Sequence, residues 1–284
     1  MAEGMPGRTV AVALREAALR LAGGSDTARL DAEVLMAHAL GVSRSDLLLR
    51  RMADAEPPAF AAWVERRARH EPVAYIVGEQ EFFGLSFRVS PDVLIPRGDS
   101  EVLVERALAL GEGPSRVLDC GVGSGALLLA VLAHRPEAVG AGIDCSAGAL
   151  AVAQANAEAL GLGVRARMIA ADWTVPGWTG EIGAPFDLIL ANPPYVEEDA
   201  DLAPSVRGYE PAGALFAGDD GLDDYRLLIP QLPPLLAAGG SALVEIGFTQ
   251  AEPVSAIARE AGFAVTLHHD LAGRPRALEL CVDG

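Results

Sequence analysis

The sequence predicts an α/β protein in which a small helical domain and a β-hairpin precede a mainly parallel sheet. Apolar residues recur every three or four positions over residues 9–70, which is typical of amphipathic helices. Residues 79–96 change to an alternating pattern rich in aromatic side chains, as in paired strands. From residue 116 onwards, short apolar runs alternate with helical stretches. That alternation favours parallel strands covered by helices on both faces.

The helical region comes first in the chain. Its apolar positions are spaced for helices that bury one face each. Ser25 or Asp26 can cap one of these helices, since both side chains accept hydrogen bonds from free backbone amides. Gly41 can end it, because glycine readily adopts the left-handed conformation that follows many helices.

A basic cluster, Arg66, Arg67 and Arg69, lies near the end of this region. Such a cluster is most often the solvated face of a helix. In a chain this acidic it can also attract an acidic or ribosome-related partner locally.

The predicted hairpin over residues 79–96 has Gly84 at its turn. It joins two larger parts, and the expected boundaries follow from it. We expect a helical domain of residues 1–75, a hairpin linker of residues 76–96 and a sheet domain of residues 97–284.

The sheet domain contains seven expected strands and the helices between them. The strands are residues 116–120, 139–144, 164–170, 188–191, 241–245, 263–268 and 277–282. The helices are residues 127–134, 147–160 and 223–236. The longest loops are residues 177–185 and 197–221, and the second is a candidate substrate lid.

Composition and charge disfavour several classes of function and partner. Of the 284 residues, 22 are basic and 39 acidic, which gives a formal charge of −17 that disfavours a nucleic-acid partner. Cys120, Cys145 and Cys281 have no paired spacing, so neither zinc nor a disulfide framework is indicated, and the five histidines lack metal-ligand spacing. The first residues do not resemble a secretory signal, and no apolar run is long enough to span a bilayer. A cytoplasmic protein is expected.

A glycine-rich turn follows the first strand of the sheet domain. There the bare backbone can approach a ligand at the amino end of the next helix. The residues of this turn are Gly121, Val122, Gly123, Ser124 and Gly125. Gly121, Gly123 and Ala126 also satisfy the dinucleotide fingerprint, so the glycines alone fit a nicotinamide cofactor or another nucleoside.

Polar residues at successive strand ends help to decide between these ligands. Asp119 precedes the glycines, and Asp144 ends the second strand, where it can bind both ribose hydroxyls. Asp172 and Trp173 follow the third strand, where they can hold an adenine by its edge and face. Together they fit S-adenosylmethionine, whose amino acid part can meet Asp119. Taken singly, Asp119 can be a structural carboxylate and Asp144 an N-cap for the next helix. Trp173 can be a core residue.

Asn192, Pro193, Pro194 and Tyr195 follow the apolar run 186–191, where a parallel strand is expected to end. Ligands of open α/β sheets bind at such carboxyl ends. The Asn192 side-chain oxygen and the Pro193 carbonyl can accept the two hydrogens of a planar NH2 group, while the Tyr195 ring packs over its plane. The simpler alternative is a stiff turn, because Asn and Pro are common turn residues.

With these motifs the chain resembles the protein glutamine N5-methyltransferase family, and within it the bacterial release factor methyltransferases. The likeness runs from about residue 68 to the carboxyl end. It is carried by Tyr75-Ile76-Val77-Gly78, Glu81-Phe82, Gly84-Leu85, Leu94-Ile95-Pro96-Arg97 with Glu101, Asn192-Pro193-Pro194-Tyr195, Tyr209-Glu210-Pro211, Asp220-Gly221-Leu222, Tyr225-Arg226, Glu245-Ile246-Gly247, Gln250 and Asp270-Leu271-Ala272-Gly273.

The resemblance implies a Rossmann-like class I methyltransferase fold, with a seven-stranded, mainly parallel sheet that contains one antiparallel strand. It also implies an amino-terminal domain that helps to engage a protein substrate. The implied reaction transfers a methyl group from S-adenosylmethionine to the glutamine of a Gly-Gly-Gln tripeptide in peptide chain release factors. We expect a monomer with no direct nucleic-acid substrate, no membrane partner and no metal.

Two positions depart from the usual family pattern. Gly98 stands where the family has the second proline of Pro-Arg-Pro, which puts the rigidity of that loop in doubt, while Ser100 keeps a hydroxyl. Pro275 replaces an acidic residue between two basic positions, and Arg276 is retained. We draw no functional conclusion from the second change.

Four other functions compete with this interpretation. A related enzyme could methylate a glutamine of a large-subunit ribosomal protein by the same chemistry. The Asn-Pro-Pro-Tyr sequence also serves enzymes that methylate the exocyclic amino group of adenine or guanine, which the net charge disfavours. A noncatalytic protein could bind the cofactor or a translation factor. Nicotinamide chemistry does not explain the Asn-Pro-Pro-Tyr turn.

Overall fold

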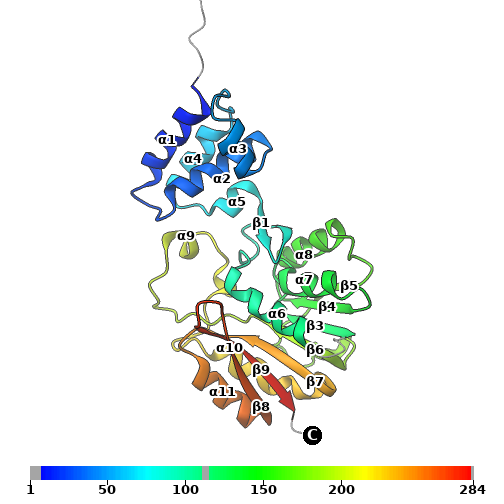
Figure 1. The fold of residues 1–284 in the computed structure, drawn as a ribbon. Helices are drawn as coiled ribbons and strands as arrows, with labels where there is room; N and C mark the ends of the chain where they lie inside the picture. The colour runs from blue at the N-terminus through cyan, green and yellow to red at the C-terminus, as the bar shows by residue number, and fades with distance from the viewer. Residues whose placement is uncertain (1–7, 111–114, 283–284) are drawn as a thin grey trace, which may run out of the picture. The chain divides into compact units, whose positions relative to one another are not determined.

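The computed structural model describes residues 8–110 and 115–282, and the chain divides into two compact units (Figure 1). The first unit comprises residues up to Gly78 together with the segment Leu202–Tyr209. The second comprises Glu79–Asp201 and Glu210–Gly284. The long loop predicted over residues 197–221 therefore contributes its middle part to the first unit.

The first unit is helical, as predicted. Its helices are α1 (Val10–Leu21), α2 (Ala28–Leu40), α3 (Arg44–Arg50), α4 (Phe60–Ala68), α5 (Val73–Val77) and, from the inserted segment, the short α9 (Pro204–Arg207). One core holds α1 to α5 together, since Leu14, Leu35, Leu47, Phe60 and Ile76 are buried in the same apolar cluster. Apolar spacing along the helices is therefore what assembles this unit.

The ends of α2 partly follow the prediction. Gly41 has a φ of +64° and ends the helix, as expected. The N-cap, however, is Thr27 rather than Ser25 or Asp26, and it makes no side-chain capping bond. The Ser25 hydroxyl is engaged elsewhere, because it donates to Asp31 at 2.7 Å and accepts from the Thr27 amide at 3.1 Å.

Two arginines of the basic cluster at the end of α4 are ion-paired within the unit, whereas Arg69 is exposed, so the expected solvated face is found only in part. Arg66 Nε donates to Glu71 at 2.8 Å, and Arg67 Nε donates to Asp31 at 2.7 Å. The Arg67 side chain is only 11% exposed. The carboxylate of such an ion pair largely cancels the positive electrostatic potential of the arginine, so the arginine attracts an acidic partner only weakly.

The second unit begins with the predicted hairpin, β1 (Glu79–Phe82) and β2 (Leu85–Arg88). The seven remaining strands, β3 (Arg116–Cys120), β4 (Val139–Asp144), β5 (Ala166–Ala170), β6 (Phe186–Ala191), β7 (Leu236–Glu245), β8 (Phe263–His269) and β9 (Pro275–Val282), form one sheet. Only β9 runs against its neighbours in this sheet. The predicted seven-stranded, mainly parallel sheet with one antiparallel strand is confirmed.

Helices cover both faces of the sheet (Figure 1). They are α6 (Glu101–Ala109), α7 (Ala126–His134), α8 (Ala147–Ala159), α10 (Asp223–Leu228) and α11 (Ala251–Glu260). Neighbouring residues of β3 belong to two different apolar clusters, one on each face of the sheet. Val117 belongs to the apolar cluster that includes α6, α7 and α8, whereas Leu118 belongs to the cluster that includes α10 and α11.

The helix expected over residues 223–236 is shorter than predicted. Helix α10 ends at Leu228, and 3₁₀ turns follow at Ile229–Gln231 and Pro233–Leu235. Proline lacks the amide hydrogen that an α-helix needs, and it clashes with the preceding turn. Pro230, Pro233 and Pro234 therefore replace a continuous helix by short turns.

The strand order is β5-β4-β3-β6-β7-β9-β8, so the chain moves outward from β3 to β5 and then returns to the other side of β3. Crevices in open α/β sheets form where the strand order reverses, at the carboxyl ends of the strands. The glycine turn follows β3 and the Asn-Pro-Pro-Tyr turn follows β6, so both lie at this reversal point.

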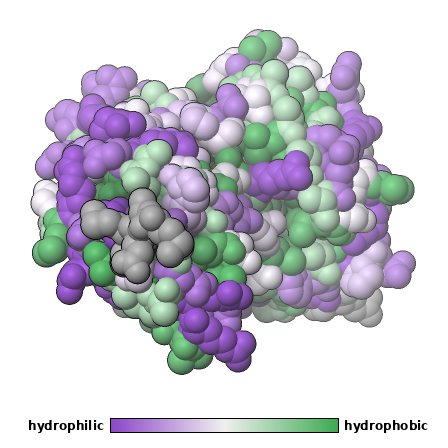
Figure 2. Space-filling view, turned by 90° about the horizontal axis from the view of Figure 1, so that it is seen from above, coloured by the Kyte–Doolittle hydropathy of each residue, from purple (hydrophilic) through white to green (hydrophobic). Residues whose placement is uncertain are grey.

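Hydrophilic and hydrophobic residues intermingle on the face shown in Figure 2. Large apolar side chains such as Leu19, Val164, Phe248 and Leu271 are exposed. Scattered exposure of this kind is normal for folded chains. None of the helices in the described ranges has the length and apolar character needed to cross a bilayer.

Candidate functional site

A cavity of about 370 Å³ opens at the carboxyl ends of β3 and β6, and all the residues that line it belong to the second unit. This volume lies within the range of small-molecule sites. Of the residues predicted to form the site, ten line the cavity: Asp119, Gly121, Val122, Gly123, Ser124, Asp144, Asp172, Trp173, Asn192 and Pro194. Gly125, Pro193 and Tyr195 are adjacent in sequence but do not line it.

The glycine turn lines this cavity and is bonded to the end of β4. Gly121, Gly123 and Gly125 have φ angles of +79°, +52° and +84°, which other residues rarely adopt. The amides of Gly121 and Val122 both donate to the Ile143 carbonyl, at 2.9 and 2.8 Å, which ties the turn to β4. A side chain in place of Gly125 would meet Leu129 at 2.8 Å, so this glycine allows close packing against α7.

Asp119 is a buried carboxylate with one engaged oxygen. It is 1% exposed, and its Oδ2 accepts from the Leu128 amide at 3.3 Å. Its Oδ1 is buried without a hydrogen-bond partner. Burial raises the pKa of Asp119 to about 7, against the opposing effect of the Leu128 amide. A buried unpaired acceptor that borders a cavity is suited to receive a donor or a positive charge from a ligand.

We expect Asp119→Asn to flatten the pH dependence of folding stability. The folded protein holds this proton up to about pH 7, whereas the unfolded chain releases it near pH 4. Folding stability conferred by the neutral form is therefore complete below pH 4 and declines as the pH rises toward 7. Thermal melting of the ligand-free protein from pH 4 to 8 should show that the variant gains most, relative to the wild type, at the alkaline end. Parallel melting profiles for the two proteins would contradict this assignment.

Asp144 fixes the turn from the end of β4. Its Oδ2 accepts from the Gly123 amide at 3.0 Å, and its Oδ1 accepts from the Ser146 amide at 2.9 Å. The N-cap of α8 is Ser146, whose hydroxyl accepts from the Ala149 amide, so Asp144 is not that cap. Each carboxylate oxygen keeps a further lone pair that can accept from a ligand hydroxyl.

Trp173 lies close to the glycine turn and lines the same cavity. The tip of its indole ring would lie 3.3 Å from a Cβ placed on Gly121. Its Nε1 donates to Asp224 Oδ1 at 3.0 Å, and its backbone carbonyl accepts from Gln231 at 3.1 Å. Burial raises the pKa of Asp224, and the indole donor opposes that shift. Asp224 was not predicted as a site residue, because no strand end or motif in the sequence marks it.

The lining is strongly acidic. It contains five aspartates, Asp92, Asp119, Asp144, Asp172 and Asp224, against one basic residue, Arg97. Arg97 is moreover ion-paired with Glu210. A site with this balance favours a ligand that carries positive charge and disfavours a diphosphate. Across the described residues, no group of His, Cys, Asp and Glu is arranged to hold a metal ion.

The Asn-Pro-Pro-Tyr turn borders the cavity directly after β6. Asn192 and Pro194 line it, whereas Pro193 is buried. Beyond the turn, the chain is tied to a distant loop, because the amides of Tyr195 and Val196 both donate to the Leu215 carbonyl, at 3.2 and 2.8 Å. These two bonds tether the Tyr195 end of the turn to the loop that contains Leu215.

The side chain of Tyr195 extends toward a buried carboxylate that the sequence did not identify as part of the site. Its hydroxyl donates to Glu245 Oε1 at 3.4 Å, and Glu245 is 2% exposed. Burial raises the pKa of Glu245 to about 7, opposed by the neighbouring Ser100 hydroxyl and Arg276. Arg276 also pairs with Asp99 at 2.8 Å, so both departures from the family pattern, at 98 and 275, lie beside residues of this cluster.

Comparisons with known proteins agree on one family. A model of the PrmC N-terminal domain matches residues 12–78, and a model of the methyltransferase small domain matches residues 98–206. The release factor glutamine methyltransferase of Rhodospirillum rubrum is 42% identical over 90% of this chain and 79% of its own length. That of Cereibacter sphaeroides is 44% identical over 93% and 95%. A methyltransferase structure from Pyrococcus furiosus, 16% identical, covers 76% of this chain and 97% of its own with a TM-score of 0.53, and so shares the fold.

Proposed function

The chain belongs to the release factor glutamine methyltransferase family, and we propose that it transfers a methyl group from S-adenosylmethionine to the glutamine of the Gly-Gly-Gln motif in peptide chain release factors. The acceptor atom is the side-chain amide nitrogen, N5. The observation that carries this proposal is the position of the Asn-Pro-Pro-Tyr turn on an acidic cavity at the reversal point of the sheet.

The residues of the cavity fit the cofactor. The unpaired Oδ1 of Asp119 would receive its ammonium group, and Asp144 would accept from its ribose hydroxyls. Asp172 and the Trp173 ring would hold its adenine, beside the glycine turn from Gly121 to Gly125. When bound, S-adenosylmethionine supplies an electrophilic methyl group on a positively charged sulfur. The acidic lining favours that net positive charge, and a bound cation would in turn favour the ionised form of Asp119.

The Asn-Pro-Pro-Tyr turn would bind the glutamine side chain. In this proposal the Asn192 side-chain oxygen and the Pro193 carbonyl accept the two hydrogens of the substrate amide, while Pro194 and Tyr195 complete the turn that orients them. An amide nitrogen is a poor nucleophile, because its lone pair is delocalised into the carbonyl. Fixing both hydrogens opposes that delocalisation and aligns the nitrogen, and such alignment can lower a barrier by several kcal/mol.

No strong general base is required before the transfer. The amide nitrogen becomes acidic as the new N–C bond forms, and its proton can then leave to water. Acceptor oxygens near the nitrogen also stabilise the positive charge that develops there. A mechanism that needs acceptor oxygens but no base is compatible with this turn, which provides an amide oxygen and a carbonyl oxygen but no basic side chain.

We further propose that the helical part, residues 1–75, engages the release factor, with residues 76–96 as the linker to the catalytic part. Release factors act on ribosomes, so the enzyme would work in the cytoplasm. We also propose that it acts as a monomer, with no nucleic-acid substrate and no membrane partner. The paired state of Arg66 and Arg67 leaves this engagement to surfaces other than the α4 arginines.

The proposed substrate can be tested by labelling. Purified enzyme with methyl-labelled S-adenosylmethionine is incubated with a release factor, with the same factor carrying Gln→Ala in its tripeptide, and with ribosomal proteins. We expect label on the wild-type factor alone. Label only on a ribosomal protein would replace the substrate while keeping the chemistry, and label on both forms of the release factor would overturn the glutamine assignment.

A further inference from the structure

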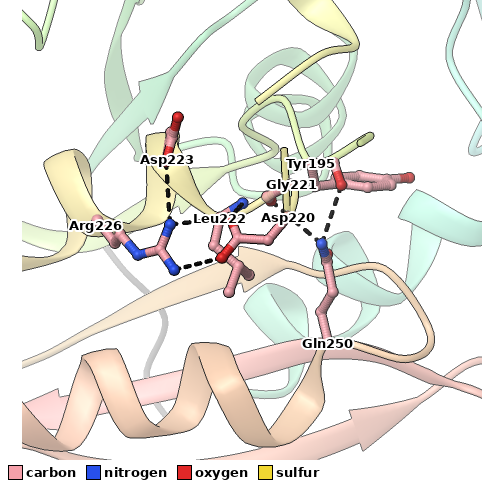
Figure 3. A network of polar contacts seen from close by, with 7 residues as sticks. All are labelled: Tyr195, Asp220, Gly221, Leu222, Asp223, Arg226 and Gln250. Atoms are coloured by element: carbon pink, nitrogen blue, oxygen red, sulfur yellow. Dashed lines mark hydrogen bonds and ion pairs between the residues drawn. The ribbon is translucent and has the colours of Figure 1, made fainter. Parts of the chain in front are cut away.

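Gln250 lies outside the cavity but is bonded to the turn that borders it (Figure 3). It follows β7 and is the N-cap residue of α11, and it is 8% exposed. Its Nε2 donates to the Tyr195 carbonyl at 3.0 Å and to the Gly221 carbonyl at 3.2 Å. Its Oε1 accepts from the Gly247 amide at 3.0 Å. The side-chain amide thus joins three separate stretches of main chain.

The two carbonyls mark the base of the long loop that follows the Asn-Pro-Pro-Tyr turn. Tyr195 is the last residue of the turn, and Gly221 is where the loop returns. Gly221 has a φ of +67°, and a Cβ there would lie 2.4 Å from the Tyr195 carbonyl oxygen. Only glycine therefore allows the two ends of the loop to approach so closely.

The returning end of the loop is itself fixed locally (Figure 3). The Asp220 carboxylate accepts from the Leu222 amide at 3.2 Å and pairs with Arg226 at 2.5 Å. Arg226 also pairs with Asp223 at 3.1 Å. Gly221 is consequently held between two anchored neighbours, and Gln250 connects this anchored end to Tyr195.

We propose that Gln250 is a positioning residue for the transfer reaction, which fixes the Tyr195 end of the Asn-Pro-Pro-Tyr turn and thereby the orientation of Asn192. The inference rests on the proposed function. Tyr195 is the only one of the turn's residues whose carbonyl Gln250 contacts, and Asn192 is three residues away along a stiff two-proline segment. A displacement at one end of such a segment is transmitted to the other, because proline restricts backbone rotation.

Gln250→Met tests this role, since methionine keeps the length of the side chain and removes its hydrogen bonds. We expect kcat for the release factor to fall about 10- to 100-fold, the range for a misplaced reacting group. The affinity for S-adenosylmethionine by calorimetry should change less than about twofold, because Gln250 is bonded to Tyr195, Gly221 and Gly247, none of which lines the cavity. Gln250→Glu, which keeps an acceptor for Gly247 but has no donor for the two carbonyls, should be impaired at least as much.

The chain offers a matched control in Gln231, which is bonded to the cavity-lining residue Trp173. Gln231 also bridges main-chain carbonyls, donating to Trp173 at 3.1 Å and to Leu227 at 2.6 Å, and it accepts from Trp178. Gln231→Met should therefore weaken cofactor binding rather than kcat. A general loss of stability would move both parameters in both variants, whereas the positioning role predicts this split.

Hydrogen–deuterium exchange tests the positioning role of Gln250 in the absence of any substrate. The amides of Tyr195 and Val196, bonded to Leu215, should exchange faster in Gln250→Met than in the wild type, while those of β4 remain unchanged. Unchanged exchange, or faster exchange with unchanged kcat, would overturn the inference. If the wild type methylates no release factor, the proposed substrate fails, and exchange alone then decides whether Gln250 anchors the turn.

Discussion

Asn192→Ala is expected to reduce methylation of the release factor by roughly 10²- to 10³-fold, the cost of losing one preorganised polar contact in a transition state. Asn192 lines the cavity at the carboxyl end of β6, and in the proposed mechanism its oxygen accepts one hydrogen of the substrate amide. Alanine leaves that hydrogen without an acceptor and lets the amide rotate. Single-turnover rates with labelled cofactor measure the effect directly.

The cofactor should still bind to the Asn192→Ala variant, with an affinity only modestly lower than that of the wild type. The bonds of Asp144 and the position of Trp173 do not depend on Asn192. Gln154→Ala is a suitable control, because Gln154 is a surface amide on α8 and, among the described residues, its side chain bonds only to Glu158, at 3.0 Å. Retained turnover in Asn192→Ala would remove this residue from the mechanism.

The predicted strands were placed well because their signal is local. Residues 116–120, for example, carry three apolar side chains and are followed by glycines, and the structure has β3 at those residues. The same holds for β4, which ends at Asp144 as predicted. Strand ends then locate the ligand side of a parallel sheet, so most predicted site residues do meet at one cavity.

What the sequence missed are partners that are distant along the chain. Asp224 contacts Trp173 across 51 positions, and Glu245 contacts Tyr195 across 50. No periodicity encodes such pairs, because they depend on which loops the fold brings together. For the same reason Arg67 was expected in solvent, although it pairs with Asp31 from another helix. Local patterns determine elements and their ends, whereas the contacts between elements need the tertiary structure.

In the proposed binding mode, Asp144→Ala is expected to raise the dissociation constant for S-adenosylmethionine by at least about 100-fold. Two contributions add: the lost contacts to the ribose hydroxyls, each worth about 1.5–3 kcal/mol for a charged acceptor, and the loosened turn. The turn loosens because Asp144 holds the Gly123 and Ser146 amides at 3.0 and 2.9 Å. Calorimetric titration measures the change. At saturating cofactor, kcat should fall less than about tenfold, since the acceptor side of the site is intact.

Asp187→Ala separates this effect from the general cost of removing a loop-binding carboxylate. Asp187 also accepts from two backbone amides, those of Ser115 and Arg116, at 2.9 and 2.8 Å, but it does not line the cavity. Both substitutions should lower the melting temperature, because each leaves two amides without their acceptor. Only Asp144→Ala should weaken cofactor binding. Equal dissociation constants for the wild type and Asp144→Ala would exclude Asp144 from the ribose role, and the acidic cavity would then act on the cofactor through its overall charge.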